Sequence, residues 1–263
     1  MATTERILKA LFCLAPPESK EEWDNVGLLC GHSDHEVWRI LVALDPSMEA
    51  AEEAAARSAE LLVTHHPVIF GSRTNVADGD PVGRTLLFLI EHGIAAINLH
   101  TNLDSAPGGV NDCLAAALGL HNTSVLVPAG KDGQGREYGL GRVGDTEEQS
   151  LSSFLPFVKK ALSCAGLRYA DGGKPVRRVA VGGGACADFL AQALAAGCDT
   201  FVTADVKYHE FCNAAALGVN LIDAGHFPTE NVVCPALAVF LRESFPEMQV
   251  FLSERHKDAV NFL

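Results

Sequence analysis

Apolar and polar residues alternate along this chain in blocks that predict short strands separated by an alanine-rich helix. Residues 39–64 (RILVALDPSMEAAEEAAARSAELLVT) start with an apolar run, pass through a polar loop into an Ala-rich stretch, and end in a second apolar run. Short apolar runs rich in Val, Ile and Leu favour buried strands, whereas the longer Ala-rich stretch favours a helix. The segment is therefore predicted to form a strand–helix–strand unit.

The same block pattern returns at residues 178–203 (RVAVGGGACADFLAQALAAGCDTFVT). A further apolar strand follows each copy, at residues 93–100 and 218–225, and each is followed by a loop and a helix. The pattern predicts an α/β fold of two similar halves that arose by internal duplication, each a mixed sheet packed with helices. The two copies align without a gap, and the identical pairs are Arg39/Arg178, Val42/Val181, Ala54/Ala193, Ala56/Ala195, Val63/Val202 and Thr64/Thr203.

A Gly-rich stretch at residues 128–144 is the expected boundary between the halves. The first half should comprise residues 1–127, completed by a C-terminal helix over residues 230–263. The second half should comprise residues 128–229. With 263 residues, of which 48% are hydrophobic, the chain can bury the core that such a fold needs.

Charge and composition narrow the class of partners. The net charge of −13 argues against nucleic-acid binding, which requires Lys and Arg to neutralise phosphates. No run reaches the ~18 apolar residues of a membrane span, and the first residues do not resemble a secretory signal. Eight cysteines occur without a C-x-x-C pair, which disfavours a zinc ribbon or redox dithiol. We expect a cytoplasmic protein with reduced thiols and no membrane partner.

Three predicted strands end in residues that commonly bind metals. ELLVTHHP ends in His65 and His66, GIAAINLHTNLD in Asp104, and GVNLIDAGHFPTE in His226 and Glu230. Open α/β sheets bind ligands beyond the carboxyl ends of their strands, and three histidines with two carboxylates suit two divalent metals. The copies differ here, so we expect both halves to contribute to one metal site in a cleft between them.

Each of these positions also has a structural interpretation. The His-His pair is compatible with a polar strand terminus, Asp104 with a turn, and Glu230 with a helix start capped by Thr229. Gly182–Gly184 follow a strand and could cradle a phosphate on backbone N–H groups.

The loop VTADVKYHE supplies further candidates for the chemistry. Asp205 and His209 could position metal ligands through hydrogen bonds or act as acid, base or substrate contacts. A solvated, charged loop explains Asp205 and His209 equally well. Near the N-terminus, Asp24 and Asn25 form either a tight turn or part of a pocket.

Six motifs occur in the order WDNVGLLCG, VTHHPVIF, NLHTNLDSAPGGVND, YGLGRVG, VTADVKYHE and IDAGHFPTE. In combination they resemble the NIF-three-like family of dinuclear metal proteins, many of whose members are described as GTP cyclohydrolase I type 2 homologues. The resemblance covers about residues 23–230. It implies a toroidal homohexamer and two divalent ions. Mixed imidazole and carboxylate ligands suit Zn, Mn, Fe, Co or Ni, and the sequence does not choose among them. One departure is Ala204, where the family usually has glycine. The implied metal ligands are His65, His66, Asp104, His226 and Glu230.

The activity that the resemblance implies is a metal-dependent hydrolase that opens the guanine imidazole ring of GTP with metal-activated water. His100, Asp205 or His209 would move protons, and the residues alone do not choose among them. Two alternatives stay open: a non-catalytic metal-binding or regulatory partner-binding protein, and a metal hydrolase acting on another nucleotide or phosphoester. The sequence contains neither a G-x-S-x-G elbow nor a P-loop, which disfavours a serine hydrolase or kinase.

Overall fold

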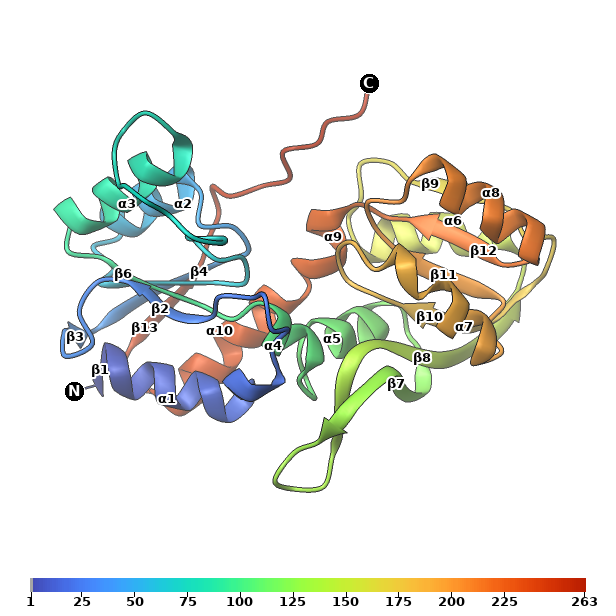
Figure 1. The fold of residues 1–263 in the computed structure, drawn as a ribbon, viewed down its shortest axis with the longest axis horizontal. Coiled ribbons are helices and arrows are strands. Elements are labelled where there is room, and N and C mark those ends of the chain that lie inside the picture. Colours follow the sequence, from blue (N-terminus) through green and yellow to red (C-terminus); the bar gives the residue numbers. More distant parts are fainter. Residues whose placement is uncertain (1) are drawn as a thin grey trace. The chain divides into compact units, whose positions relative to one another are not determined.

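The computed structural model describes residues 2–263, which form two compact units (Figure 1). Unit 1 contains the chain up to Leu103 together with Cys234–Lys257, and unit 2 contains Asp104–Val233 together with Asp258–Leu263. Helix α4 (Thr101–Ser105) and helix α10 (Val233–Ser244) each include a crossing point between the units. Within the described residues, no helix is both long and apolar enough to cross a membrane.

Unit 1 is built on a five-stranded sheet of order β13-β4-β5-β6-β2, in which only β2 runs antiparallel to its neighbour. Strand β1, which directly precedes helix α1, pairs with β3 in a small antiparallel sheet. The elements of unit 1, besides α4 and α10, are β1 (Ala2–Thr3), α1 (Thr4–Leu14), η1 (Pro17–Ser19), β2 (Gly27–Cys30), β3 (Glu36–Val37), β4 (Arg39–Ala43), α2 (Met48–Ala56), β5 (Leu61–Thr64), α3 (Pro81–Glu91), β6 (Ala95–Asn98) and β13 (Gln249–Leu252).

Unit 2 is built on a six-stranded sheet of order β7-β8-β10-β11-β12-β9, with three central parallel strands and antiparallel neighbours on both sides. Residues 128–144 lie in the hairpin of β7 and β8. The elements are α5 (Val110–Ala117), β7 (His121–Lys131), β8 (Glu137–Gln149), α6 (Leu151–Ala161), β9 (Arg168–Ala170), β10 (Val176–Val181), η2 (Ala187–Phe189), α7 (Leu190–Ala195), β11 (Thr200–Thr203), α8 (Tyr208–Leu217), β12 (Asn220–Asp223) and α9 (His226–Glu230).

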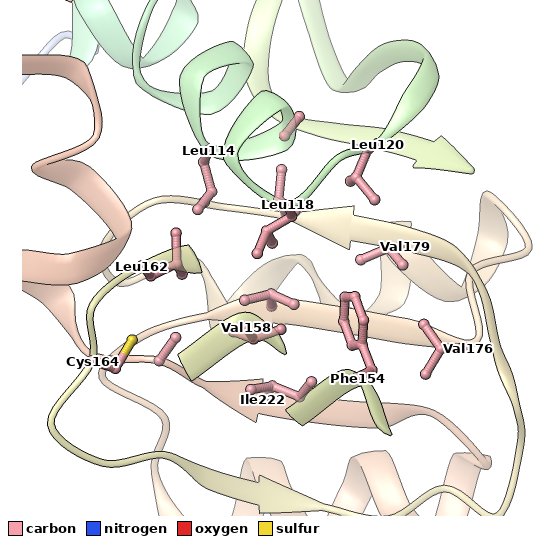
Figure 2. Close-up of a cluster of buried hydrophobic side chains, with 14 of the residues drawn as sticks. Leu114, Leu118, Leu120, Phe154, Val158, Leu162, Cys164, Val176, Val179 and Ile222 are labelled. Atoms are coloured by element: carbon pink, nitrogen blue, oxygen red, sulfur yellow. The ribbon is translucent and has the colours of Figure 1, made fainter. Parts of the chain in front are cut away.

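Both faces of the unit 2 sheet are covered, which explains why its central strands carry apolar residues at consecutive positions. Val179 packs with Phe154 of α6 in one cluster, as Figure 2 shows, and the cluster also contains Val202. Ala180 and Phe201 belong to the cluster on the opposite face. Successive side chains on a strand point to opposite faces, so a sheet buried on both sides favours runs of consecutive apolar residues over strict alternation. The predicted α/β fold with mixed sheets packed by helices is confirmed.

The two copies aligned from the sequence form the same elements in the two units. Strand β5 and strand β11 occupy aligned positions, and α2 corresponds to η2 together with α7. Residue pairs across the strands also match, because Ile40 lies opposite Leu61 in unit 1 and Val179 lies opposite Thr200 in unit 2. A common origin of the copies remains a prediction, but their shared strand register follows from equivalent apolar positions.

Candidate metal centre

Three histidines gather where β5 and β6 end in unit 1. His65 and His66 directly follow β5, and His100 follows the adjacent parallel strand β6. One ring nitrogen from each histidine lies within 4.8 Å of the others. The carboxyl ends of neighbouring parallel strands meet at one edge of the sheet, which is why residues 34 positions apart come together here.

His65 and His66 are each held through Nδ1. His65 Nδ1 lies 2.8 Å from the carbonyl oxygen of Leu99, and His66 Nδ1 lies 2.7 Å from Asp45 Oδ1. A carbonyl oxygen only accepts hydrogen bonds, so Nδ1 of His65 is the donor, and Nε2 is the nitrogen left to bind a metal. Metal-binding histidines in proteins are commonly oriented by such an acceptor behind the ring. Both rings therefore suit metal binding through Nε2.

His100 is held in the same way by Asp24. The distance from His100 Nδ1 to Asp24 Oδ1 is 2.7 Å, and the Thr101 backbone N–H and hydroxyl both donate to Asp24 Oδ2. Burial acts to raise the pKa of Asp24, but the hydrogen bonds from His100 and Thr101 outweigh it and hold the pKa well below its usual value. Asp24 is thus an ionised anchor for His100.

In unit 2, helix α9 brings His226 and Glu230 together across one turn. His226 Nε2 lies 3.0 Å from Glu230 Oε2, and His226 Nδ1 lies 2.7 Å from Asp205 Oδ2. The expected cap at Thr229 is wrong, because α9 begins at His226 after Gly225. The Thr229 hydroxyl instead donates to the carbonyl oxygens of Gly225 and His226 within the turn.

The glycines after β10 make room for Glu230. A Cβ added at Gly184 would lie 2.2 Å from Glu230 Oε1, and the backbone there has a positive φ of 64°. The N–H groups of Gly183 and Gly184 donate to Asn111 Oδ1 and Thr229 Oγ1. Because these donors are already used inside unit 2, they do not form the phosphate cradle that the sequence allowed.

Asp104 and Glu230 both act on the thiol of Cys186. Burial raises the pKa of Cys186, and the charges of Asp104 and Glu230 raise it further. The effect requires both carboxylates to lie near the same thiol. Asn111 Nδ2 also donates to the backbone oxygen of Asp104 and fixes the end of α4.

The residues proposed for proton transfer occupy different environments. His100 lies in the unit 1 histidine group, and Asp205 holds His226. His209 is exposed near the start of α8, with a ring contact to Tyr208, and no group of potential metal ligands in residues 2–263 includes it. Asp45 was missed in the sequence, although its place just after β4 follows the same strand-end rule.

Comparison with known proteins shows the family to which the chain belongs. A family model described as Duf34/NIF3 (NGG1p interacting factor 3) matches residues 2–259. This chain belongs to the Duf34/NIF3 family. The resemblance seen in the six motifs is thereby confirmed.

Two relatives of this Duf34/NIF3 protein carry the same name. It is 32% identical to a "GTP cyclohydrolase 1 type 2 homolog" of Clostridium perfringens, over 98% of each chain. It is 39% identical to the Streptomyces coelicolor protein of that name, over 97% of this chain and 88% of the relative. Among solved structures, a Bacillus cereus protein related to NIF3 superposes with a TM-score of 0.93 at 26% identity, covering 100% of this chain and 99% of that one.

Proposed function

We propose that this Duf34/NIF3 protein binds two divalent metal ions and acts as a metal-dependent hydrolase. The observation that carries the proposal is that Nδ1 of each candidate histidine is held by a hydrogen-bond partner. His65 is held by Leu99, His66 by Asp45 and His226 by Asp205. Imidazole nitrogens and carboxylate oxygens together suit Zn, Mn, Fe, Co and Ni, so the donors fit the implied ions. The proposed ligands are His65, His66, Asp104, His226 and Glu230.

The proposal requires ligands from both units to share the two ions, in the cleft expected from the sequence. Asp104 is the first residue of unit 2, and Glu230 lies shortly before the chain returns to unit 1 at Cys234. The covalent crossings therefore keep the carboxylates of unit 2 close in sequence to unit 1.

When bound, two divalent ions would supply Lewis acidity and lower the pKa of a water molecule towards neutrality. The residues of the chain have separable tasks. Asp24 holds His100 beside His65 and His66, which makes His100 the best supported candidate for moving a proton. Asp205 holds His226 and is a positioning residue, while His209 remains a candidate for substrate contact.

The substrate that we propose is a small molecule with a hydrolysable ring, with GTP as the first candidate because the relatives are named after that activity. Another nucleotide or a phosphoester would use the same ligands. We further propose a cytoplasmic homohexamer, as expected from the family resemblance.

The first test is metal content per chain by mass spectrometry, after reconstitution, for the parent, Glu230→Ala and the exposed control Glu91→Ala. We expect about two metals in the parent and the control and a clear loss in Glu230→Ala. Turnover of GTP should follow the metal content. A parent without metal after reconstitution would contradict the dinuclear site, and equal turnover with and without metal would contradict the hydrolase.

A non-catalytic metal-binding role is the second candidate, and the exposure of His226 favours it. The His226 side chain is 38% exposed, so solvent and competing ligands can reach this donor. Exchange of the bound metal with an isotope of the same element distinguishes the two roles. Exchange in seconds without turnover of any nucleotide supports metal delivery, whereas slow exchange with turnover supports the hydrolase.

A further inference from the structure

Two exposed aromatic side chains border the unit 1 histidines. Trp23 is 60% exposed and Phe70 is 63% exposed, and their ring centroids lie 5.8 Å apart at an interplanar angle of 61°. The centroid of His100 lies 6.0 Å from that of Trp23 and 6.2 Å from that of Phe70. His100 in turn lies 5.3 Å from His65, so the rings form a continuous path to the candidate metal ligands.

The backbone beneath these rings is firmly held. Asn25 Nδ2 donates to the carbonyl oxygen of Ile69, which joins the segment that carries Trp23 to the segment that carries Phe70. Asn98 Nδ2 donates to the backbone oxygen of Asn25 and anchors this region to β6. Two large rings are therefore kept exposed on an ordered backbone, and a ligand that contacts them meets a preorganised surface.

We propose that Trp23 and Phe70 form a subsite for a planar nitrogen heterocycle of the nucleobase type, which would lie beside His100. Aromatic side chains bind bases by stacking, because every base has a π face. Glu21 and Glu22 directly precede Trp23. Charged residues are depleted at the cores of protein interfaces, so a small ring is a better occupant than a protein partner.

This inference rests on the proposed function in one respect, because it assigns the substrate class to the same site. The stacking itself does not need metal. The subsite can therefore be tested with metal-free protein and a nucleoside, without any turnover, so that its failure and the failure of the hydrolase proposal are separate results.

The chain has two tryptophans, so Trp38→Phe leaves Trp23 as the single indole reporter. In this background the full chain, stripped of metal with a chelator, is titrated with guanosine and, separately, with ribose while Trp23 fluorescence is recorded. We expect a saturable change with guanosine and none with ribose. Phe70→Ala should weaken guanosine binding roughly tenfold, and Phe157→Ala, an exposed aromatic of unit 2, should leave it unchanged.

Three results would overturn the subsite. One is a change that stays linear with guanosine, as collisional quenching does. Another is equal binding by Phe70→Ala and Phe157→Ala, with both variants folded by circular dichroism. The third is a Trp23 signal that depends on protein concentration and not on guanosine, which would assign the two rings to an interface with a second copy of the chain.

Discussion

The parallel strands β4, β5 and β6 of unit 1 and β10, β11 and β12 of unit 2 pair in the same register, yet the residues that follow them differ. The two units share the hydrogen bonds that hold the beginnings of these strands. Glu60 accepts hydrogen bonds from the N–H groups of Trp38 and Arg39, and Asp199, at the aligned position, accepts them from Arg177 and Arg178.

At the strand ends, the two units use one principle in different places. In unit 1 a carboxylate after β4, Asp45, holds a histidine after β5, His66, at 2.7 Å. In unit 2 a carboxylate after β11, Asp205, holds a histidine after β12, His226, also at 2.7 Å. The pair is shifted by one strand. The pairing of the strands fixes where they end, and the residues that follow them can differ without loss of the sheet.

The largest loss of stability should come from changes in the core of the parallel strands that the two units share. Phe201 of β11 and Leu62 of β5 occupy aligned positions, and both are fully buried. Phe201→Ala should cost about 3–5 kcal/mol of the free energy of unfolding and Leu62→Ala about 2–5 kcal/mol, because each leaves a cavity. Denaturant unfolding of the full chain measures both, with the exposed Val239→Ala as control. If either core variant loses no more unfolding free energy than that control, the buried strand core is not what stabilises the fold.

A second change tests the end of β10 in unit 2, where Gly184 lies against Glu230. Gly184→Ala should cost about 2–3 kcal/mol, since the new Cβ meets Glu230 and the backbone φ is positive. Gly197→Ala is a matched control, because its φ is 77° but nothing lies within 4 Å of the added Cβ. Thermal unfolding and metal content should separate the two variants. Equal losses would mean that backbone strain, and not the contact with Glu230, decides the cost.

The carboxylates behind the histidines should have matching effects in the two units. Asp45→Ala and Asp205→Ala should each lower metal affinity about 10–100-fold, because the outer acceptor orients the ring and raises its basicity. Competition with a chromogenic chelator measures the affinity, and the exposed Asp34→Ala serves as control. An effect in one unit only would show that the histidines of the other unit do not bind the ions.

The smallest effect on stability should come from Glu60 and Asp199, the two acidic residues at aligned positions before β5 and β11. Glu60→Gln and Asp199→Asn should each cost about 1 kcal/mol, because the charge-assisted hydrogen bonds weaken at a partly exposed position. Similar losses of unfolding free energy in the two variants would support equivalent roles for Glu60 and Asp199. A loss in only one variant would contradict that equivalence.

The pH dependence of Glu60 gives this test a sign. Burial acts to raise the pKa of Glu60, but hydrogen bonds from Arg39 and from the Trp38 and Arg39 N–H groups outweigh it, so the folded pKa is lowered. Ionised Glu60 therefore stabilises the fold above the unfolded carboxyl pKa of about 4.3, and this contribution disappears as the pH falls through the lower folded value. The difference in unfolding free energy between the parent and Glu60→Gln should shrink accordingly. A difference that stays constant on acidification would refute the assignment.

Much of the framework could be read from the chain because its causes are local. The strand–helix–strand copies followed from block patterns of apolar residues, and the positions after β5, β6 and β12 followed from the rule that sheets bind ligands at strand ends. The helix at the C-terminus was only partly foreseen, since residues 230–263 contain α10 and then β13, which adds to the sheet beside β4.

The sequence by itself determined the α/β class, the family and the strand-end histidines and carboxylates, because short periodic patterns and motif order specify them. Only the tertiary structure decided which group holds which. Asp24 and His100 are 76 residues apart, and Asp205 and His226 are 21 apart, so no local pattern links the partners. The same holds for Gly184, whose lack of a side chain matters only because the fold brings Glu230 against it. Contacts of this kind arise from the pairing of distant strands, which fixes positions that the chain order leaves open.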